Sequence, residues 1–237
     1  MTALPLLHIV EPSRLLLTWQ PVDESAPLRT RRTVGEVLHE DGNTEWVFRY
    51  LKNTADFVAA KAAGFQGFPA FPLEGVEVRQ GVRETLMRRL PPAKREDFAD
   101  FLAQHRLPSP FAYSDLALLG YTGARLPSDG FALVPEFPMD AVPCDYLMEV
   151  AGLRHVYNGL MTDIHDGDAV SFQSEPSNPV DVDALAVLHE GRTIGYVTRT
   201  LRRNFQSWLS THQVTATVER QNGKPERPLV YLRISVS

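Results

Sequence analysis

The chain has 237 residues, 43% of them hydrophobic and 22% charged, a globular composition with room for one large or two small domains. The formal net charge of −5 excludes a generic polyanion-binding surface but leaves room for a local basic groove. A single cysteine, Cys144, excludes an internal disulfide framework and a cysteine-rich zinc site, and it fits a reducing compartment.

The first segment, residues 1–14, is too short and too interrupted by proline to span a membrane. It also lacks the basic start of a signal peptide, so we expect a cytoplasmic protein. Short strands are predicted next, at residues 14–20, 32–40 and 45–51, and the turn sequence EDGN between the last two indicates a hairpin.

Helical spacing of apolar residues follows the hairpin. The first predicted helix has Asn53 or Thr54 as its N-cap and Gly64 as its stop, and the last begins at Ser114 and ends at Gly120. Two more segments with helical spacing of apolar residues lie between these two helices. A strand is predicted after them, at residues 130–137. The predicted elements make an α+β domain.

Three prolines at positions 135, 138 and 143 indicate an extended connector, because proline fixes φ and removes a donor. We therefore predict a domain at residues 1–137, a linker at 138–146 and a second domain at 147–237. In the second domain the apolar period changes to two, with predicted strands at 183–190, 193–198, 214–220 and 229–236 and one main helix at 199–212. Short strands with one helix suggest a small closed or partly open barrel.

The order of motifs in the second domain resembles the HIRAN domain. Such domains carry Gly-x-Arg, then Gly-Asp before a strand, then Glu-Pro-x-Asn-Pro-x-Asp, and later Gly-Tyr before a helix. The matching residues are Gly152, Arg154, Gly167, Asp168, Glu175, Pro176, Asn178, Pro179, Asp181, Ala184, Gly195 and Tyr196. The resemblance implies a mostly-β, OB-like barrel that captures the 3′ end of single-stranded DNA.

In the resembled family, residues at the positions of Arg154 and Asp181 lie in the DNA groove, where the Asp meets the terminal hydroxyl. Aromatic side chains sandwich the last bases, and each stacked base contributes about 1–3 kcal/mol. The predicted nucleic-acid-binding residues are Arg154, His155, Tyr157, Asn178, Asp181, Tyr196, Arg199, Arg202 and Arg203.

This chain departs from the family pattern at its aromatics. His155 and Val156 stand where two tyrosines are common, with Tyr157 one position later, and Val180 replaces another frequent tyrosine. Asp183 replaces a usual asparagine. Lost stacking platforms and an added carboxylate both weaken the expectation of tight single-strand binding.

Two interpretations of the Asn178–Asp181 segment stay open. In one, Asn178 and Asp181 cap a loop through side-chain hydrogen bonds to the backbone, and Pro179 stiffens it. In the other, both residues face a nucleic-acid groove with arginines around them. The arginines open a predicted helix, where cations do not complement the dipole, which slightly favours binding.

Residues 14–136 resemble the N-terminal subdomain of HipA-type kinases, through segments such as EWVFRYL, GFQGFPAFPLEG and DLALLGYTGARLPSDGFALVP. The phosphate loop and the catalytic and metal segments of a kinase core are missing. The resemblance implies a module that docks on a separate HipA-like kinase, as an antitoxin would. Its predicted partner-binding residues are Phe65, Phe68 and Phe71, although they could instead close the domain's own core.

Catalytic and metal sites are not expected. The segment 162–168 offers Asp163, His165, Asp166 and Asp168, but Gly167 fits a turn into a strand better than a metal loop. No Gly-x-Ser-x-Gly elbow is present, and Cys144 has no evident activating base. The sequence therefore predicts a protein without enzymatic activity, cofactor or metal: a nucleic-acid-binding adaptor or, alternatively, a protein-docking, antitoxin-like module.

Overall fold

The computed structural model describes residues 4–23, 30–39, 45–126, 128–156, 163–224 and 227–237. The chain divides into two compact units. The N-terminal unit is Glu11–Pro138, and the C-terminal unit combines Met1–Val10 with Met139–Ser237. Among the described residues, none of the helices is long and apolar enough to cross a membrane.

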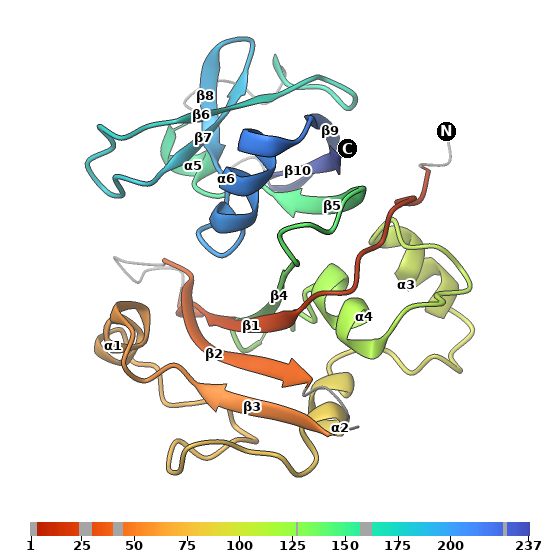
Figure 1. Ribbon diagram of the computed structural model, residues 1–237, viewed down its shortest axis with the longest axis vertical. Coiled ribbons are helices and arrows are strands. Elements are labelled where there is room, and N and C mark those ends of the chain that lie inside the picture. The colour runs from red at the N-terminus through yellow and green to blue at the C-terminus, as the bar shows by residue number, and fades with distance from the viewer. Residues whose placement is uncertain (1–3, 24–29, 40–44, 127, 157–162, 225–226) are drawn as a thin grey trace. The chain divides into compact units, whose positions relative to one another are not determined.

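The N-terminal unit is built on an antiparallel sheet with the strand order β3-β2-β1-β4 (Figure 1). The strands are β1 (Arg14–Trp19), β2 (Arg32–His39), β3 (Trp46–Tyr50) and β4 (Phe131–Glu136). Strand β1 is central and carries a continuous buried run, Leu15 to Leu17, as expected for a strand covered on both faces.

Four helices are described in this unit: α1 (Ala55–Ala62), α2 (Val82–Met87), α3 (Phe98–Gln104) and α4 (Asp115–Thr122). Of the two predicted N-cap candidates of α1, Asn53 and Thr54, it is Thr54 whose side chain accepts from Phe57 N. The predicted N-cap Ser114 is confirmed, because its side chain accepts from Ala117 N. Helix α1 packs beside β2, and α4 packs beside β1 and β4.

The predicted end of the last helix at Gly120 is wrong. Helix α4 continues to Thr122 and is capped by Gly123, whose φ of 71° is left-handed. Gly120 instead lies where the helix touches the sheet. A Cβ atom there would be 2.9 Å from Leu15 Cδ2 and 3.0 Å from Pro135 Cβ, so glycine allows the close approach.

The predicted partner-binding residues Phe65, Phe68 and Phe71 are not on the surface. They are 1%, 5% and 3% exposed and belong to the aromatic core of the N-terminal unit. Phe65 packs on Trp19, Phe68 on Phe131 and Phe71 on Phe48, with ring centroids 5.4, 5.0 and 4.5 Å apart. The segment closes the core of its own domain, since burying these rings removes a large apolar area from water.

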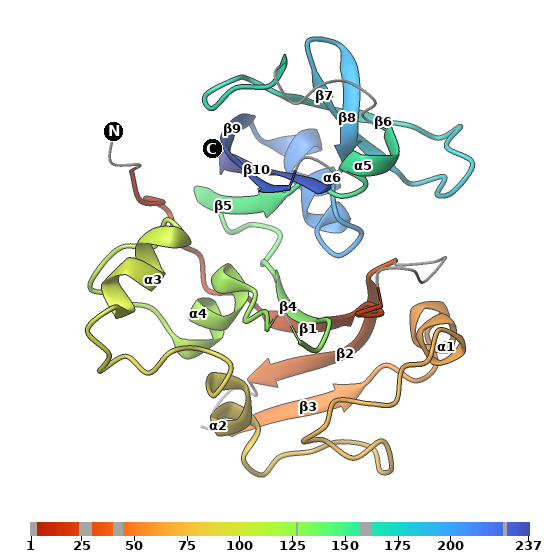
Figure 2. The same ribbon diagram turned by 180° about the vertical axis from the view of Figure 1, so that it is seen from behind.

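The C-terminal unit contains two antiparallel sheets, with the orders β5-β10-β9 and β6-β7-β8 (Figure 2). The strands are β5 (Cys144–Glu149), β6 (Ser171–Ser174), β7 (Leu185–His189), β8 (Arg192–Tyr196), β9 (Val214–Lys224) and β10 (Arg227–Val236). The helices are α5 (Leu153–Val156) and α6 (Arg202–Thr211). Phe205 and Trp208 of α6 are fully buried, and Phe205 meets Phe172 of β6.

The predicted OB-like barrel is not closed by continuous strand ladders. Single bridges, Ala151–Tyr196 and Ala169–Thr217, connect the two sheets in the described residues. The bridge between Ala151 and Tyr196 has two backbone hydrogen bonds of ordinary length, at 2.8 and 2.9 Å. The β-rich expectation is thus correct for this unit, but the ladder is interrupted at two seams, as in a partly open barrel.

The division of the chain differs from the predicted boundaries at 137 and 147. Strand β5 begins inside the predicted linker, at the fully buried Cys144. Residues 4–10 also belong to the C-terminal unit. Leu7 N and His8 N donate to Asp145 Oδ2 at 2.9 and 3.0 Å, and Leu6 is buried. A short N-terminal arm gives no periodic signal from which its long-range docking could be predicted.

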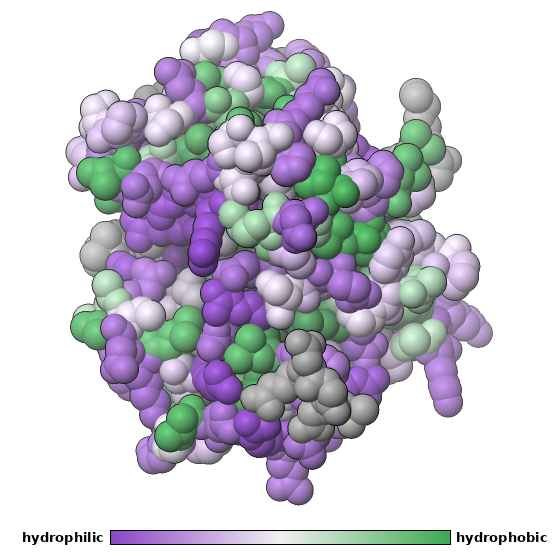
Figure 3. All heavy atoms as spheres, viewed as in Figure 1, coloured by the Kyte–Doolittle hydropathy of each residue, from purple (hydrophilic) through white to green (hydrophobic). Residues whose placement is uncertain are grey.

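The surface view in Figure 3 shows hydrophobic residues in separate patches among hydrophilic ones. The large apolar side chains with the greatest exposure include Val76 in the N-terminal unit and Val180 in the C-terminal unit, at 84% and 81%. Isolated apolar side chains of this kind are common on globular proteins. The exposure of Val180 alone therefore does not indicate a binding site. The interpretation of its loop depends on the polar contacts around it.

Candidate nucleic-acid interface

The loop at residues 175–183 connects β6 to β7 and is fixed by its own hydrogen bonds. At its two ends Glu175 N donates to Ala184 O at 2.9 Å, and Ala184 N donates to Asp181 O at the same distance. Within the loop, Asn178 Oδ1 accepts from Val180 N at 2.9 Å and from Asp181 N at 3.1 Å. Asn178 thus acts as the loop cap that the first interpretation predicts.

The other end of the Asn178 amide anchors this loop to the rest of the unit. Its Nδ2 donates to Glu175 Oε2 at 2.9 Å and to Tyr196 Oη of β8 at 3.1 Å. Burial, together with the hydrogen bond and charge of Glu175, raises the pKa of the Tyr196 phenol. Asn178 and Tyr196, both predicted as site residues, therefore form the support of the loop.

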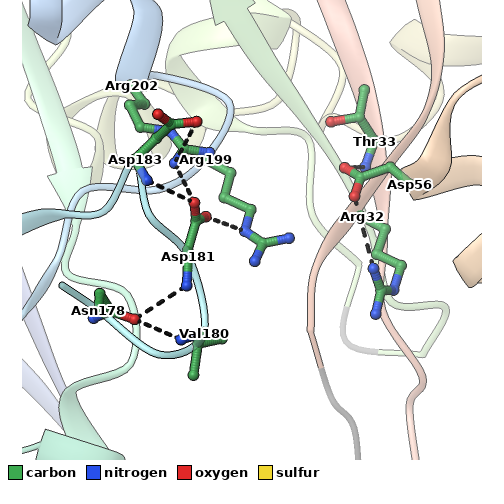
Figure 4. A network of polar contacts seen from close by, with 9 residues as sticks. All are labelled: Arg32, Thr33, Asp56, Asn178, Val180, Asp181, Asp183, Arg199 and Arg202. Carbon is green, nitrogen blue, oxygen red and sulfur yellow. Dashed lines mark hydrogen bonds and ion pairs between the residues drawn. The ribbon is translucent and has the colours of Figure 1, made fainter. Parts of the chain in front are cut away.

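Asp181 is held by two arginines from the segment that leads into α6 (Figure 4). Arg202 Nη1 lies 2.7 Å from Asp181 Oδ1, and Arg199 Nε lies 2.9 Å from Asp181 Oδ2. Burial opposes ionisation of the carboxyl. The hydrogen bond from Arg202, the N–H of Asp183 and both arginine charges nevertheless lower the Asp181 pKa.

The local sequence explains why these groups meet. Strand β8 ends at Tyr196, Arg199 follows in the turn, and Arg202 is the first residue of α6. A carboxylate beside the first turn of a helix is also favoured by the helix dipole. The side chains of Asp181 and Arg202 are 19% and 17% exposed and that of Arg199 is 38% exposed, so Arg199 is the outer member.

Comparison with known proteins identifies the C-terminal unit. The HIRAN domain model matches residues 145–237, while the curated proteins contain no match to the chain. Residues 145–237 form a HIRAN domain. The match does not extend to Glu11–Pro138, so the resemblance of the N-terminal unit to HipA-type kinases stays a prediction.

Two solved structures are similar to part of this chain. One is the HIRAN domain of human HLTF, at 21% identity, covering 39% of this chain and 74% of that one, with a TM-score of 0.32. The other is a protein from Lactobacillus plantarum, at 22% identity, covering 40% of this chain and 95% of that one, also with a TM-score of 0.32.

The remaining predicted site residues of the HIRAN domain are distributed differently. Arg203 is exposed on α6, one position beyond Arg202 and therefore on another side of the helix. Arg154 and His155 lie in α5, where the backbone alone is described, and Tyr157 lies outside the described residues. Convergence of all the predicted arginines on one groove stays a prediction.

The segment considered as a metal loop is described from Asp163 onward and contains a turn at Asp166 and Gly167. Asp168 Oδ2 accepts from His165 N at 2.7 Å and lies 3.0 Å from Nε2 of the buried His189. Backbone hydrogen bonding from His165 and the two histidines lowers the Asp168 pKa. Asp168 thus serves the turn that Gly167, with φ of 94°, was expected to make.

Sequence reasoning missed two features of the loop. One of its two interpretations placed Asp181 and the arginines in one groove, but neither predicted that they would pair directly. It also treated Asp183 solely as a departure from the family pattern. In fact Asp183 N donates to Asp181 Oδ1 at 3.2 Å, and its carboxylate lies 3.9 Å from Arg202 Nη1. The two-residue spacing of the aspartates, opposite an arginine pair, was the available signal.

Proposed function

We propose that the HIRAN domain of this chain binds single-stranded DNA at its 3′ end and that the protein is a non-enzymatic adaptor. The proposal follows from the family match and from one observation. Asp181 is oriented by Arg199 and Arg202 in a partly exposed loop, at the position where the resemblance implies contact with the terminal hydroxyl.

The chemistry of the cluster suits a strand end that carries a neutral hydroxyl and a nearby phosphodiester. An ionised carboxylate has about four lone-pair positions, so Asp181 can accept from a hydroxyl while it binds its arginines. Arginine is suited to phosphate oxygens through its planar set of donors. Arg199, the more exposed arginine, would contact the phosphate next to the terminal sugar.

Weak binding is expected. Val180, although 81% exposed, offers no aromatic face on which a base can stack. The net charge of −5 also gives no long-range attraction for DNA. Most of the affinity would come from a few phosphate and sugar contacts, so it should fall as salt is added.

Fluorescence anisotropy at low salt tests this function with a short labelled strand that ends in a 3′ hydroxyl. We expect saturable binding that is about tenfold weaker for Arg199→Ala, because the phosphate contact is lost. The matched control is Arg192→Ala, which removes one positive charge from β8. The Arg192 side chain is 59% exposed and forms loose ion pairs. Equal weakening by both substitutions would indicate non-specific charge attraction, and wild-type protein that does not bind the strand would disprove the proposed function.

Docking of the N-terminal unit on a HipA-like kinase stays a prediction without an identified surface. The phenylalanines to which that role was assigned are buried in the core of the unit. Half-exposed aromatic side chains do occur elsewhere, at Phe98 and Phe101 of α3, with stacked rings 5.8 Å apart. This pair alone does not indicate the kind of partner, so DNA binding by the HIRAN domain is the function supported best.

A further inference from the structure

The N-terminal arm, residues 4–10, is held against strand β5, which lies at the edge of its sheet. Its contacts centre on Asp145, which is 5% exposed. The carboxylate of Asp145 accepts from Leu7 N and His8 N at 2.9 and 3.0 Å, and its backbone N–H donates to His8 O at 2.8 Å. Because the arm lies outside residues 145–237, the match to the HIRAN model does not account for this contact.

A second anchor for the arm is Arg233 of β10. Its Nη1 donates to Pro5 O at 3.2 Å, and its Nη2 donates to Leu4 O. The Nε of the same guanidinium donates to Glu219 Oε2 at 2.8 Å. The Glu219 side chain is 9% exposed, so this contact fixes the guanidinium in place. Asp145 thus binds backbone N–H groups of the arm, and Arg233 binds backbone carbonyls.

The leucines and the isoleucine of the arm divide into buried and exposed side chains. Leu6 and Ile9 are 2% and 9% exposed, whereas Leu4 and Leu7 are 76% and 73% exposed. The site therefore selects an extended segment with two apolar residues three positions apart, while its polar groups bind backbone atoms that every such segment has. Recognition at a sheet edge generally works in this way, because main-chain hydrogen bonds supply affinity and pockets for a few side chains supply specificity.

The arm is joined to the rest of the chain through an irregular segment. Residues 4–13 contain neither a helix nor a strand. The chain leaves the C-terminal unit after Val10, and the next residue, Glu11, accepts from Ser114 N at 2.9 Å within the N-terminal unit. A change of backbone angles around residues 10–13 can therefore release the arm while every helix and strand stays intact.

We propose that the edge of β5 is a self-association site, at which the arm of a second copy of this chain binds, so that two chains join by exchanging arms. The second copy is the partner that the contacts support, because its arm is identical to the segment that already fits the site. In the exchanged dimer each site keeps its contacts through Asp145 and Arg233, so the exchange needs no new interface. The tether holds each arm near its own site at an effective concentration on the order of millimolar, so the closed monomer dominates in dilute solution.

Complementation between two variants of the whole chain tests the exchange. Leu6→Ser leaves the site at β5 intact and weakens docking of the arm, by about tenfold to a hundredfold for the loss of one buried leucine side chain. Asp145→Ala damages the site and leaves the arm intact. Each variant alone should be monomeric in size-exclusion chromatography with light scattering. An equimolar mixture near millimolar concentration should form a one-to-one dimer, because the arm of Asp145→Ala binds the open site of Leu6→Ser.

The matched control is Leu7→Ser, the same substitution at a neighbouring side chain that is 73% exposed. Its arm stays docked on its own chain, so its mixture with Asp145→Ala should stay monomeric. Circular dichroism verifies that each variant is folded. The exchange is disproved if the mixture of Leu6→Ser with Asp145→Ala contains monomers alone, or if a dimer forms equally well with Leu7→Ser.

Wild-type protein provides a test that does not depend on how the variants fold. Light scattering from micromolar to about millimolar concentration should show the dimer appear at the upper end of the range. An excess of a synthetic peptide of residues 4–13 should reduce the dimer fraction, because the peptide competes with the arm for the site. Wild type that stays monomeric over this range, or a dimer that the peptide does not affect, would overturn the proposal.

Discussion

The loop at residues 175–183 and the segment at residues 65–71 both contain proline and both connect regular elements, yet they have opposite surroundings. In the loop, polar side chains satisfy one another and the backbone while valines face solvent. In the segment, three aromatic rings are buried and Tyr50 supplies the polar contacts, accepting from Phe68 N and donating to Phe71 O, both at 2.8 Å. Paired charged groups at a surface can still contact a ligand, whereas buried rings contribute to the stability of the domain.

The largest expected effect follows from the aromatic segment. Phe65→Ala should destabilise the N-terminal unit by about 3–5 kcal/mol, because it removes a ring that is 1% exposed and leaves a cavity. Chemical denaturation followed by tryptophan fluorescence measures the loss, since Trp19 packs on Phe65. The control Val76→Ala alters a side chain that is 84% exposed in the same unit and should change stability by less than about 0.5 kcal/mol. Similar losses of stability in the two variants would contradict the assignment of Phe65 to the core and Val76 to the surface.

A smaller effect is expected from the cap of the HIRAN loop. Asn178→Ala leaves Val180 N and Asp181 N without the side-chain oxygen that accepts from them and removes the link to Tyr196. We expect a loss of about 1–2 kcal/mol, the usual cost of deleting a side chain that caps backbone donors. Thermal unfolding measures it, with Ser177→Ala, an exposed neighbour, as the control.

The same Asn178→Ala variant also relates the loop to binding. If the loop positions Asp181 for DNA, binding to the 3′-hydroxyl strand should weaken in this variant while the domain stays folded. Unchanged binding would mean that Asn178 stabilises the loop without orienting Asp181, and the first interpretation, in which the loop is a structural element, would then account for the motif alone.

How far the sequence predicts this molecule depends on the range of the interactions involved. Capping is local, so Thr54 and Ser114 were found from their own neighbourhood, and the spaced HIRAN motif was found because its residues occur in a fixed order. Gly120 was misassigned, because a glycine that permits close packing looks like a helix stop when the opposing strand is unknown.

Pairing across long sequence separations was the less predictable part. Arg202 and Asp181 are 21 residues apart, and the sequence placed them near one another through family resemblance alone. This ion pair changes how the arginines are interpreted, because much of the positive charge of the arginines is already balanced within the loop. The aromatics at 65–71 show the same limit, because burial depends on strands at residues 14–19 and 131–136.

The smallest expected effect is the pH dependence of the loop. The arginine contacts of Asp181 keep its pKa in the folded protein below the value of about 3.9 found in unfolded chains. Its ion pairs therefore stabilise the HIRAN domain fully above that value, and the contribution disappears as the pH falls through the folded pKa. Wild type should be more stable than Asp181→Asn at pH 7, and the difference should diminish below about pH 4. Thermal unfolding of both proteins between pH 3 and pH 7 measures this, and a difference that stays constant over the range would show that the arginines do not stabilise the ionised carboxylate.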